Sequence, residues 1–286
     1  MTDIVGEIDA YLRRLFPLNR SLSGDGNRET LRVLSEVVPI ALTEVPSGEA
    51  VFDWTIPEEW NVRDAWIALP DGRRVVDFRQ SNLHLVSYSE PFRGNLDWTA
   101  LKPHLHLHPV LPEAIPYRTS YYRRTWGFCL TRSQYDVLEA HGGPFEVVVD
   151  SELKPGSLTY GETLIAGDSK QEILVSCYIC HPSMANDSLS GVLLTAFLAR
   201  ALRERKERRF SYRVVFVPET IGAVAYCARN EAAMKRIDLG LVATTVGGPG
   251  KFGVKQSFDP GHPINQMIAE VFAESGVDPI VYPFDI

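Results

Sequence analysis

Three short apolar runs, separated by segments with helical spacing, constrain the fold of this chain most strongly. The runs cover residues 172–179, 212–217 and 239–246 and are rich in β-branched side chains. Such runs are typical of strands that are buried on both faces of a sheet. Residues 191–202 and 221–230, which lie between them, carry apolar side chains at helical spacing. This alternation predicts an α/β fold with a mostly parallel sheet covered by helices on both faces.

A histidine and two carboxylates follow the predicted strands at their carboxyl ends. His181 precedes Pro182, which cannot continue a strand ladder, so the first strand should end at the histidine. Asp187 lies in the loop that follows, and Glu219 comes directly after Pro218 at the end of the second strand. Ligands of open α/β sheets bind beyond the carboxyl ends of strands. We therefore expect these three side chains to lie close together.

These residue types suit a metal hydrolase. A neutral imidazole and a carboxylate are ordinary zinc ligands, and catalytic zinc keeps a position open for water. Zinc lowers the pKa of that water to about 7. A further carboxylate that does not bind the metal can take the proton and return it to the leaving group. Glu219 is the candidate for this role of general base.

The same residues also have non-catalytic interpretations. His181 is in a loop, and Asp187 has neighbours that are common at helix caps. Glu219 falls in the first turn of a predicted helix, where the helix dipole favours acidic side chains. Residue types alone leave both interpretations open.

The strings CHPSMANDSLSG at residues 180–191 and VPETIGA at residues 217–223 resemble the M28-type zinc peptidases. The resemblance is to their aminopeptidase-like domain, in the DUF4910 branch with an inserted DUF2172 domain. It extends over nearly the whole chain and includes FPLNRSLSG, NLHLVSYS and IPYRTSYY at residues 16–24, 82–89 and 115–122. The resemblance implies a zinc-exopeptidase-like fold, with His181 as a metal ligand. It further implies Asp187 as the carboxylate that bridges two metals in typical members, and Glu219 as general base.

The chain departs from the family's pattern at several ligand positions. The pattern has two consecutive glutamates, base then ligand, where this chain has Glu219 and Thr220. Residues 244–248 contain no carboxylate, although a further acidic ligand is expected there. The family's late histidine comes from a segment beyond Ile286, and we do not assign that role to His262. We therefore expect one zinc ion rather than two.

Residues 48–155 differ from the rest of the chain in composition and in the pattern of apolar residues. All five tryptophans lie in this segment, together with many prolines and short alternating runs. We expect residues 48–155 to form an inserted, mainly β domain. Residues 1–47 and 156–286 then form the aminopeptidase-like α/β domain. The apolar run at residues 279–284 is typical of a strand with no unit after it, so we expect this domain to be truncated at its C-terminus.

Composition excludes several classes of partner. The net charge is −7, and phosphate neutralisation needs clustered cations, so we expect no nucleic-acid partner. The dense basic run at residues 203–209 is typical of a solvated helix end. No segment approaches the roughly 20 apolar residues of a membrane span, and the N-terminus lacks the features of a secretory signal. We expect a cytoplasmic protein without a membrane partner; the oligomeric state is not indicated.

Two short patterns suggest other cofactor sites. Cys177 and Cys180 with the following histidine match a haem-attachment motif, but residues three apart on a strand point to opposite faces. His104, His106 and His108 alternate, which would place three imidazoles on one strand face, but flanking prolines favour a surface loop. We expect neither pattern to bind a cofactor, and we expect the four cysteines to stay reduced.

Three functions follow from the resemblance. The first is a zinc-dependent hydrolase of the aminopeptidase type, which cleaves an amide next to a free amino group in a small peptide or amide. The second is an amidase or deacylase that acts on a sugar or natural-product intermediate, because the family is associated with polysaccharide biosynthesis. The third is a non-catalytic relative that binds a peptide or glycan after losing ligands at Thr220 and Gly248.

Overall fold

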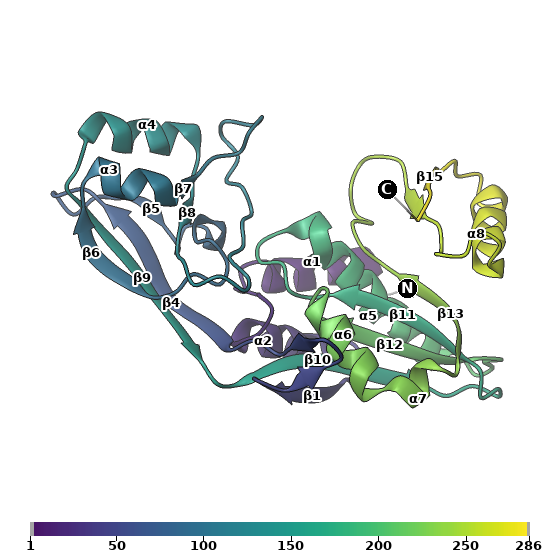
Figure 1. Cartoon of the computed structure of the whole chain (residues 1–286). Helices are drawn as coiled ribbons and strands as arrows, with labels where there is room; N and C mark the ends of the chain where they lie inside the picture. Colours follow the sequence, from purple (N-terminus) through teal and green to yellow (C-terminus); the bar gives the residue numbers. More distant parts are fainter. Residues whose placement is uncertain (1–2, 285–286) are drawn as a thin grey trace.

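Two sheets organise the chain, and the computed structural model describes residues 3–284 of the 286 (Figure 1). The five-stranded sheet has the order β1-β10-β12-β11-β13. Its strands are β1 (Ala41–Pro46), β10 (Ser157–Ile165), β11 (Glu172–Tyr178), β12 (Ser211–Val217) and β13 (Ile237–Val242). The four-stranded sheet has the order β5-β4-β9-β6. Its strands are β4 (Glu59–Ala68), β5 (Arg74–Asp77), β6 (Phe92–Leu96) and β9 (Phe145–Lys154).

The five-stranded sheet combines parallel and antiparallel pairings. β11 pairs in parallel with β12 and with β13. β10 pairs antiparallel with β12 and with β1, so the expectation of a mostly parallel sheet is wrong for this half. The physical reason is the short connection at residues 166–171, because a crossover between parallel strands needs about a dozen residues or more. β10 must therefore run opposite to β11.

Helices cover both faces of the five-stranded sheet, as the sequence predicts. One face carries α1 (Ile4–Leu15), α2 (Asp25–Leu34) and α5 (Gly191–Glu204), and the other carries α6 (Ile221–Arg229), which α7 (Glu231–Met234) follows. Alternate residues of β12 divide between these layers. Val214 and Phe216 pack with residues of α1, α2 and α5, whereas Val215 and Val217 pack with α6. The α/β fold class is confirmed.

Residues 48–155 contain the four-stranded antiparallel sheet and its short connections. The remaining elements are β2 (Ala50–Val51), β3 (Trp54–Thr55), α3 (Trp98–Leu101), β7 (Leu105–His106), β8 (Phe128–Cys129) and α4 (Arg132–His141). Single 3₁₀ turns occur at Asn82–His84 and Lys102–His104. The content is mainly β, while the division of the chain into two domains stays a prediction.

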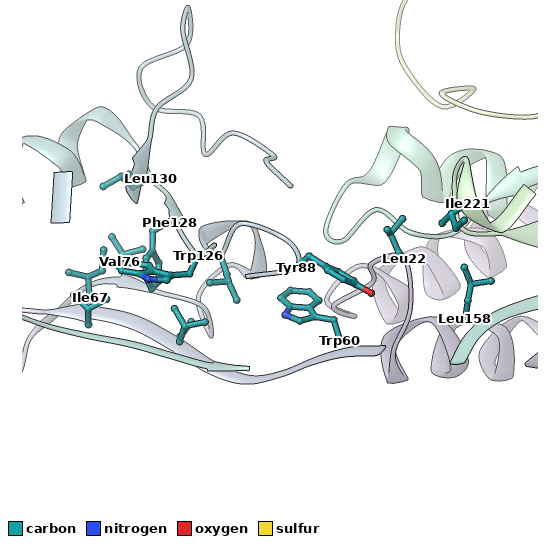
Figure 2. Packing of buried hydrophobic residues seen from close by; sticks show 14 of the residues in the cluster. Leu22, Trp60, Ile67, Val76, Tyr88, Trp126, Phe128, Leu130, Leu158 and Ile221 are labelled. Carbon is teal, nitrogen blue, oxygen red and sulfur yellow. The ribbon is translucent and has the colours of Figure 1, made fainter. Parts of the chain in front are cut away.

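One hydrophobic cluster runs from the four-stranded sheet into the five-stranded sheet. Figure 2 shows it passing from Ile67 and Val76, past Trp60, to Leu158 and Ile221. Trp60 is buried, and its indole nitrogen donates to the Ser89 carbonyl oxygen at 2.8 Å. The two sheets therefore share a core.

The C-terminal elements lie apart from the five-stranded sheet (Figure 1). β14 (Gly253–Lys255) pairs in parallel with β15 (Ile280–Tyr282), and α8 (Pro263–Glu274) connects them. The apolar run at residues 279–284 thus contains a strand, β15, which pairs with the preceding strand β14. Among the helices of residues 3–284, none has the length and apolar character needed to cross a membrane.

An ion pair connects the two sheets. Nη2 of Arg28, on α2, lies 2.6 Å from Oε2 of Glu59, the first residue of β4. The same carboxylate oxygen accepts from the backbone N–H of Ser157, at the start of β10. Hydrogen bonding to the Arg28 guanidinium lowers the pKa of Glu59 from 4.5 to about 2. The ionised form of this carboxylate therefore stabilises the junction.

The Arg28–Glu59 pair predicts a pH-dependent stability. Because the pKa of Glu59 is lower in the folded state, its contribution is present above about pH 4.5 and is lost as the pH falls toward 2. Glu59→Gln should lower the free energy of unfolding by about 1–3 kcal/mol at pH 7. Urea unfolding followed by circular dichroism should show the difference from wild type narrowing below pH 4.5.

Glu29→Gln is the matched control on the same helix. Glu29 pairs with Arg32 on the exposed surface of α2, and exposed pairs contribute about 0–1 kcal/mol. A Glu59→Gln deficit that stays constant from pH 7 to pH 3 would contradict the assignment.

Candidate metal centre

His181, Asp187 and Glu219 lie together beyond the carboxyl ends of β11 and β12. Nδ1 of His181 is 3.7 Å from Oδ1 of Asp187. Nε2 of the same imidazole is 3.4 Å from Oε2 of Glu219. One imidazole therefore lies between the two carboxylates that the sequence predicts beside it.

Local backbone structure explains how the loop after β11 presents Asp187. Residues Ala185–Ser190 form a helical turn that leads into α5, and the backbone of Asp187 departs from helical geometry inside it. The side chain of Asp187 accepts from the Tyr178 hydroxyl at 2.6 Å. α5 has no side-chain cap. The interpretation of Asp187 as a helix cap is therefore wrong.

Strained backbone surrounds the site. Ser183, Thr220 and Thr245 have φ angles of 43°, 57° and 50°, and each lies in a loop that follows one of the three parallel strands. Positive φ at a residue other than glycine costs on the order of 1–3 kcal/mol. Such residues cluster at functional sites.

The imidazole is buried and the carboxylates are open to solvent. The His181 side chain is 10% exposed, compared with 45% for Asp187 and 53% for Glu219. Burial lowers the pKa of His181, against the opposing effect of the two carboxylates. The imidazole is therefore neutral near pH 7, which is the form that binds metals.

The donor set fits a zinc ion. Nδ1 of His181 is buried and has no hydrogen-bond partner within residues 3–284. Two zinc bonds of about 2.0–2.2 Å span up to about 4 Å between ligand atoms, so the His181–Asp187 distance suits a shared ion. Ligand atoms of Cys180, His181 and Glu219 also lie within 4.8 Å of one another, and Glu219 is nearest to Nε2, the other ring nitrogen. Nitrogen, oxygen and sulfur donors are all available on this side of the sheet.

Cys180 is a site residue that the sequence interpretation missed. Its Sγ accepts from the backbone N–H of Glu219 at 3.2 Å. Burial raises the pKa of this thiol to about 12, so without a metal it stays protonated. Its position directly before His181 was the available signal, but pattern reasoning treated it as a small apolar side chain.

A chain of hydrogen bonds connects Asp187 to Tyr178 and Tyr178 to Thr244. Tyr178 ends β11, and its ring packs edge-to-face on His181 with centroids 5.0 Å apart. Its hydroxyl also bonds to the Thr244 hydroxyl, in the loop after β13. Thr244 lies in the segment where the family's pattern has an acidic ligand. Here it contributes a hydroxyl that contacts Tyr178.

Two residues from distant segments also reach the site. Arg20 is 1% exposed, and its Nε donates to the carbonyl oxygen of His181 at 2.9 Å. Burial lowers the pKa of Arg20 to about 10, so it stays charged at neutral pH. Tyr117, from the connection between β7 and β8, packs edge-to-face on His181, and the centroids of the two rings are 5.2 Å apart. Nothing local in the sequence indicates either contact.

The other patterns singled out in the sequence do not form shared sites. His104 stacks on Trp126 and its Nδ1 contacts the Trp126 carbonyl oxygen, whereas Nδ1 of His108 accepts from the N–H of Leu111. Within residues 3–284, the one group of three side chains close enough together to hold a metal ion is that of Cys180, His181 and Glu219. All four cysteines are free.

The structure thus combines an α/β fold with a histidine and two carboxylates at one edge of its sheet. Comparison with known families makes this more specific. Residues 9–285 match the family model described as the domain of unknown function DUF4910, and the chain belongs to that family.

Relatives agree with this assignment. A Clostridium acetobutylicum protein described as a candidate polysaccharide biosynthesis protein with aminopeptidase-like domain is 44% identical over 279 residues, covering 98% of this chain and 64% of the relative. The crystal structure of a candidate peptidase from the same species has a TM-score of 0.95 at 43% identity, covering 99% of this chain and 66% of that one. This chain therefore spans less than two thirds of either relative's length.

A more distant structure shares the fold alone. BSAP, a zinc aminopeptidase from Bacillus subtilis, has a TM-score of 0.63 at 9% identity, covering 96% of this chain and 79% of that one. This likeness confirms a zinc-aminopeptidase type of fold.

Gly191 predicts a packing constraint beside the site. A Cβ at this first residue of α5 would lie 2.2 Å from the Ala243 carbonyl oxygen, in the loop that carries Thr244. Gly191→Ala should therefore lower the free energy of unfolding by about 1–3 kcal/mol, measured by thermal or urea unfolding. Gly250→Ala, where the new Cβ meets nothing within 4 Å, is the control. Equal stability of the two variants would refute the close approach.

Proposed function

We propose that this protein is a zinc-dependent hydrolase of the aminopeptidase type. It cleaves an amide next to a free amino group in a small peptide or amide substrate. His181 and Asp187 hold the ion, and Glu219 is the general base. The observation that carries the proposal is the placement of both carboxylates within 3.7 Å of one neutral, buried imidazole.

Each residue has a role that follows from its surroundings. Zinc at this site would supply Lewis-acid chemistry and lower the pKa of a water molecule to about 7. Because the imidazole of His181 is neutral, one of its ring nitrogens has a free lone pair for the metal. The Tyr178 hydroxyl orients the Asp187 carboxylate. Glu219 is half exposed, so its carboxylate can accept a proton from water and return it to the leaving amine.

One ion, rather than two, is the proposed stoichiometry. Thr220 occupies the position of a glutamate ligand in the family's pattern. Thr244 contacts the Tyr178 hydroxyl and carries no carboxylate. These two positions support a single ion held through His181 and Asp187.

The amide of a sugar or natural-product intermediate is a second candidate substrate. The name of the 44% identical relative, which links an aminopeptidase-like domain with polysaccharide biosynthesis, favours it. The site residues and the chemistry would stay the same. A non-catalytic protein that binds a peptide or glycan is the remaining alternative, and the absence of acidic residues at Thr220 and Gly248 favours it.

The domain division and the setting are also proposals. Residues 48–155 form an inserted domain of the DUF2172 type, supported by the four-stranded antiparallel sheet within them. The rest of the chain forms the aminopeptidase-like domain. We propose that the protein acts in the cytoplasm, without a membrane or nucleic-acid partner.

Metal analysis and one substitution test the catalytic proposal. Zinc-reconstituted protein should retain about one equivalent of zinc and hydrolyse members of a panel of aminoacyl anilides and N-acylated amino sugars. Chelation should abolish turnover. Glu219→Gln should keep the zinc but lose about 10²–10⁴-fold in kcat, because general-base catalysis contributes that much.

Glu274→Gln, on the exposed side of α8, is the control and should behave as wild type. Zinc retention under about half an equivalent, together with unchanged turnover in Glu219→Gln, would reject the catalytic proposal. Stoichiometric zinc without turnover on either substrate class would favour the binding protein.

Tyr178 predicts a graded effect on metal affinity. Removing a group that orients a ligand typically costs 10–100-fold in affinity, so Tyr178→Phe should weaken zinc binding by about 10-fold. Competition with a chromophoric chelator measures this change. Tyr212→Phe on β12 is the control. Equal zinc affinity in both variants would show that the Tyr178 hydroxyl does not orient Asp187.

A further inference from the structure

Three segments that the proposed function does not use contact one another, and two of them reach His181. They cover residues 16–24, 82–89 and 115–122, and they carry the family resemblance away from the metal-binding strings. They belong to different parts of the chain: the first precedes α2, and the other two lie among the elements around the four-stranded sheet. Arg20 contacts the backbone of His181 and Tyr117 contacts its imidazole.

Arg20 attaches the first segment to the end of β11. Its Nε donates to the His181 carbonyl oxygen at 2.9 Å and its Nη1 to the Leu15 carbonyl oxygen at 2.6 Å. Burying a charged side chain is costly unless it is hydrogen-bonded, and these two bonds offset part of that cost, although Nη2 is buried without a partner among residues 3–284. This arginine therefore fixes the backbone of residues 16–24 against the metal centre.

Serine hydroxyls and backbone bonds continue this connection to the other two segments. Ser21 and Ser87, both buried, have their hydroxyl oxygens 2.8 Å apart. The Ser87 N–H donates to the Arg118 carbonyl oxygen, and the Ser120 N–H donates to the Ser87 carbonyl oxygen, both at 2.9 Å. These bonds hold residues 115–122 in position relative to residues 16–24, the segment that contacts the backbone of His181.

Tyr117 is the side chain that this scaffold presents to the site. Its ring lies edge-to-face on the His181 imidazole at an interplanar angle of 83°. Its hydroxyl is 3.0 Å from the hydroxyl of Tyr121. Unlike the serines behind it, Tyr117 is only partly buried. A tyrosine side chain that is not fully covered is therefore held next to the candidate metal ligand.

We propose that residues 115–122 form a wall of the substrate site, with the Tyr117 hydroxyl in contact with the substrate. Tyr121 is a positioning residue that holds this hydroxyl. The inference rests on the proposed function, since it names a substrate contact of the same site. A phenol hydroxyl both donates and accepts hydrogen bonds, so the group bound at Tyr117 is an amide or hydroxyl of the substrate.

Tyr117→Phe tests the contact because it removes the hydroxyl and keeps the ring. With a zinc-loaded protein, kcat/KM should fall about 10-fold, the effect of one lost hydrogen bond of upper-range strength. The dissociation constant of L-leucine hydroxamate, measured by calorimetry, should rise by a similar factor. Zinc content and Tm should not change. Tyr121→Phe should show a smaller loss of the same kind.

Tyr122→Phe is the matched control. Tyr122 follows directly in the chain and is 58% exposed, and its ring packs on Trp54 away from His181. It should match wild type in every measurement. Identical hydroxamate binding and kcat/KM in Tyr117→Phe and Tyr122→Phe would overturn the contact, as would a loss in Tyr117→Phe that is accompanied by lost zinc or a lower Tm.

Failure of the proposed function gives a different result. If wild type hydrolyses none of the amides yet binds the hydroxamate, and Tyr117→Phe weakens that binding, the catalytic proposal fails and the contact stands. If wild type hydrolyses amides and Tyr117→Phe is unaffected, only the contact fails. If wild type binds no hydroxamate and shows no turnover, both fail.

Discussion

The parallel register between β11 and β12 is the constraint on which the site depends. Tyr178 is paired with Val217, so both strands end at the same level of the sheet. Pro182 and Pro218 follow within a few residues and prevent either strand from continuing. His181 and Glu219 emerge side by side for this reason. A shift of one residue would turn the side chains of either strand to the opposite face.

A buried ion-pair cluster supports this register at the other end of the strands. Arg213, on β12, binds Glu172 at the start of β11 and also contacts Glu162 on β10, so one guanidinium connects three strands. The side chains of Arg213 and Glu172 are each 7% exposed. Buried ion pairs add little net stability, but removing one partner leaves an uncompensated charge. The cluster therefore penalises any pairing in which these residues do not face each other.

Sequence patterns revealed the elements whose signals are local. β-branched runs, helical spacing and prolines located β11, β12, α5 and α6, and they placed His181, Asp187 and Glu219 near one sheet edge. The third strand ends at Val242, earlier than its apolar run suggests, because its pairing with β11 stops at Ser176. The reversed β10 escaped prediction because a short connection decides its direction. Arg20 and Tyr117 escaped because their contacts with His181 span long stretches of chain.

The shared hydrophobic cluster also has a consequence for folding. Trp60, Tyr88 and Leu22 lie where the cluster passes from one sheet to the other (Figure 2). If either sheet melted alone, the apolar residues of the other at this boundary would meet water. The two sheets therefore do not have separate hydrophobic interiors. Such a continuous interior favours unfolding of the two sheets together.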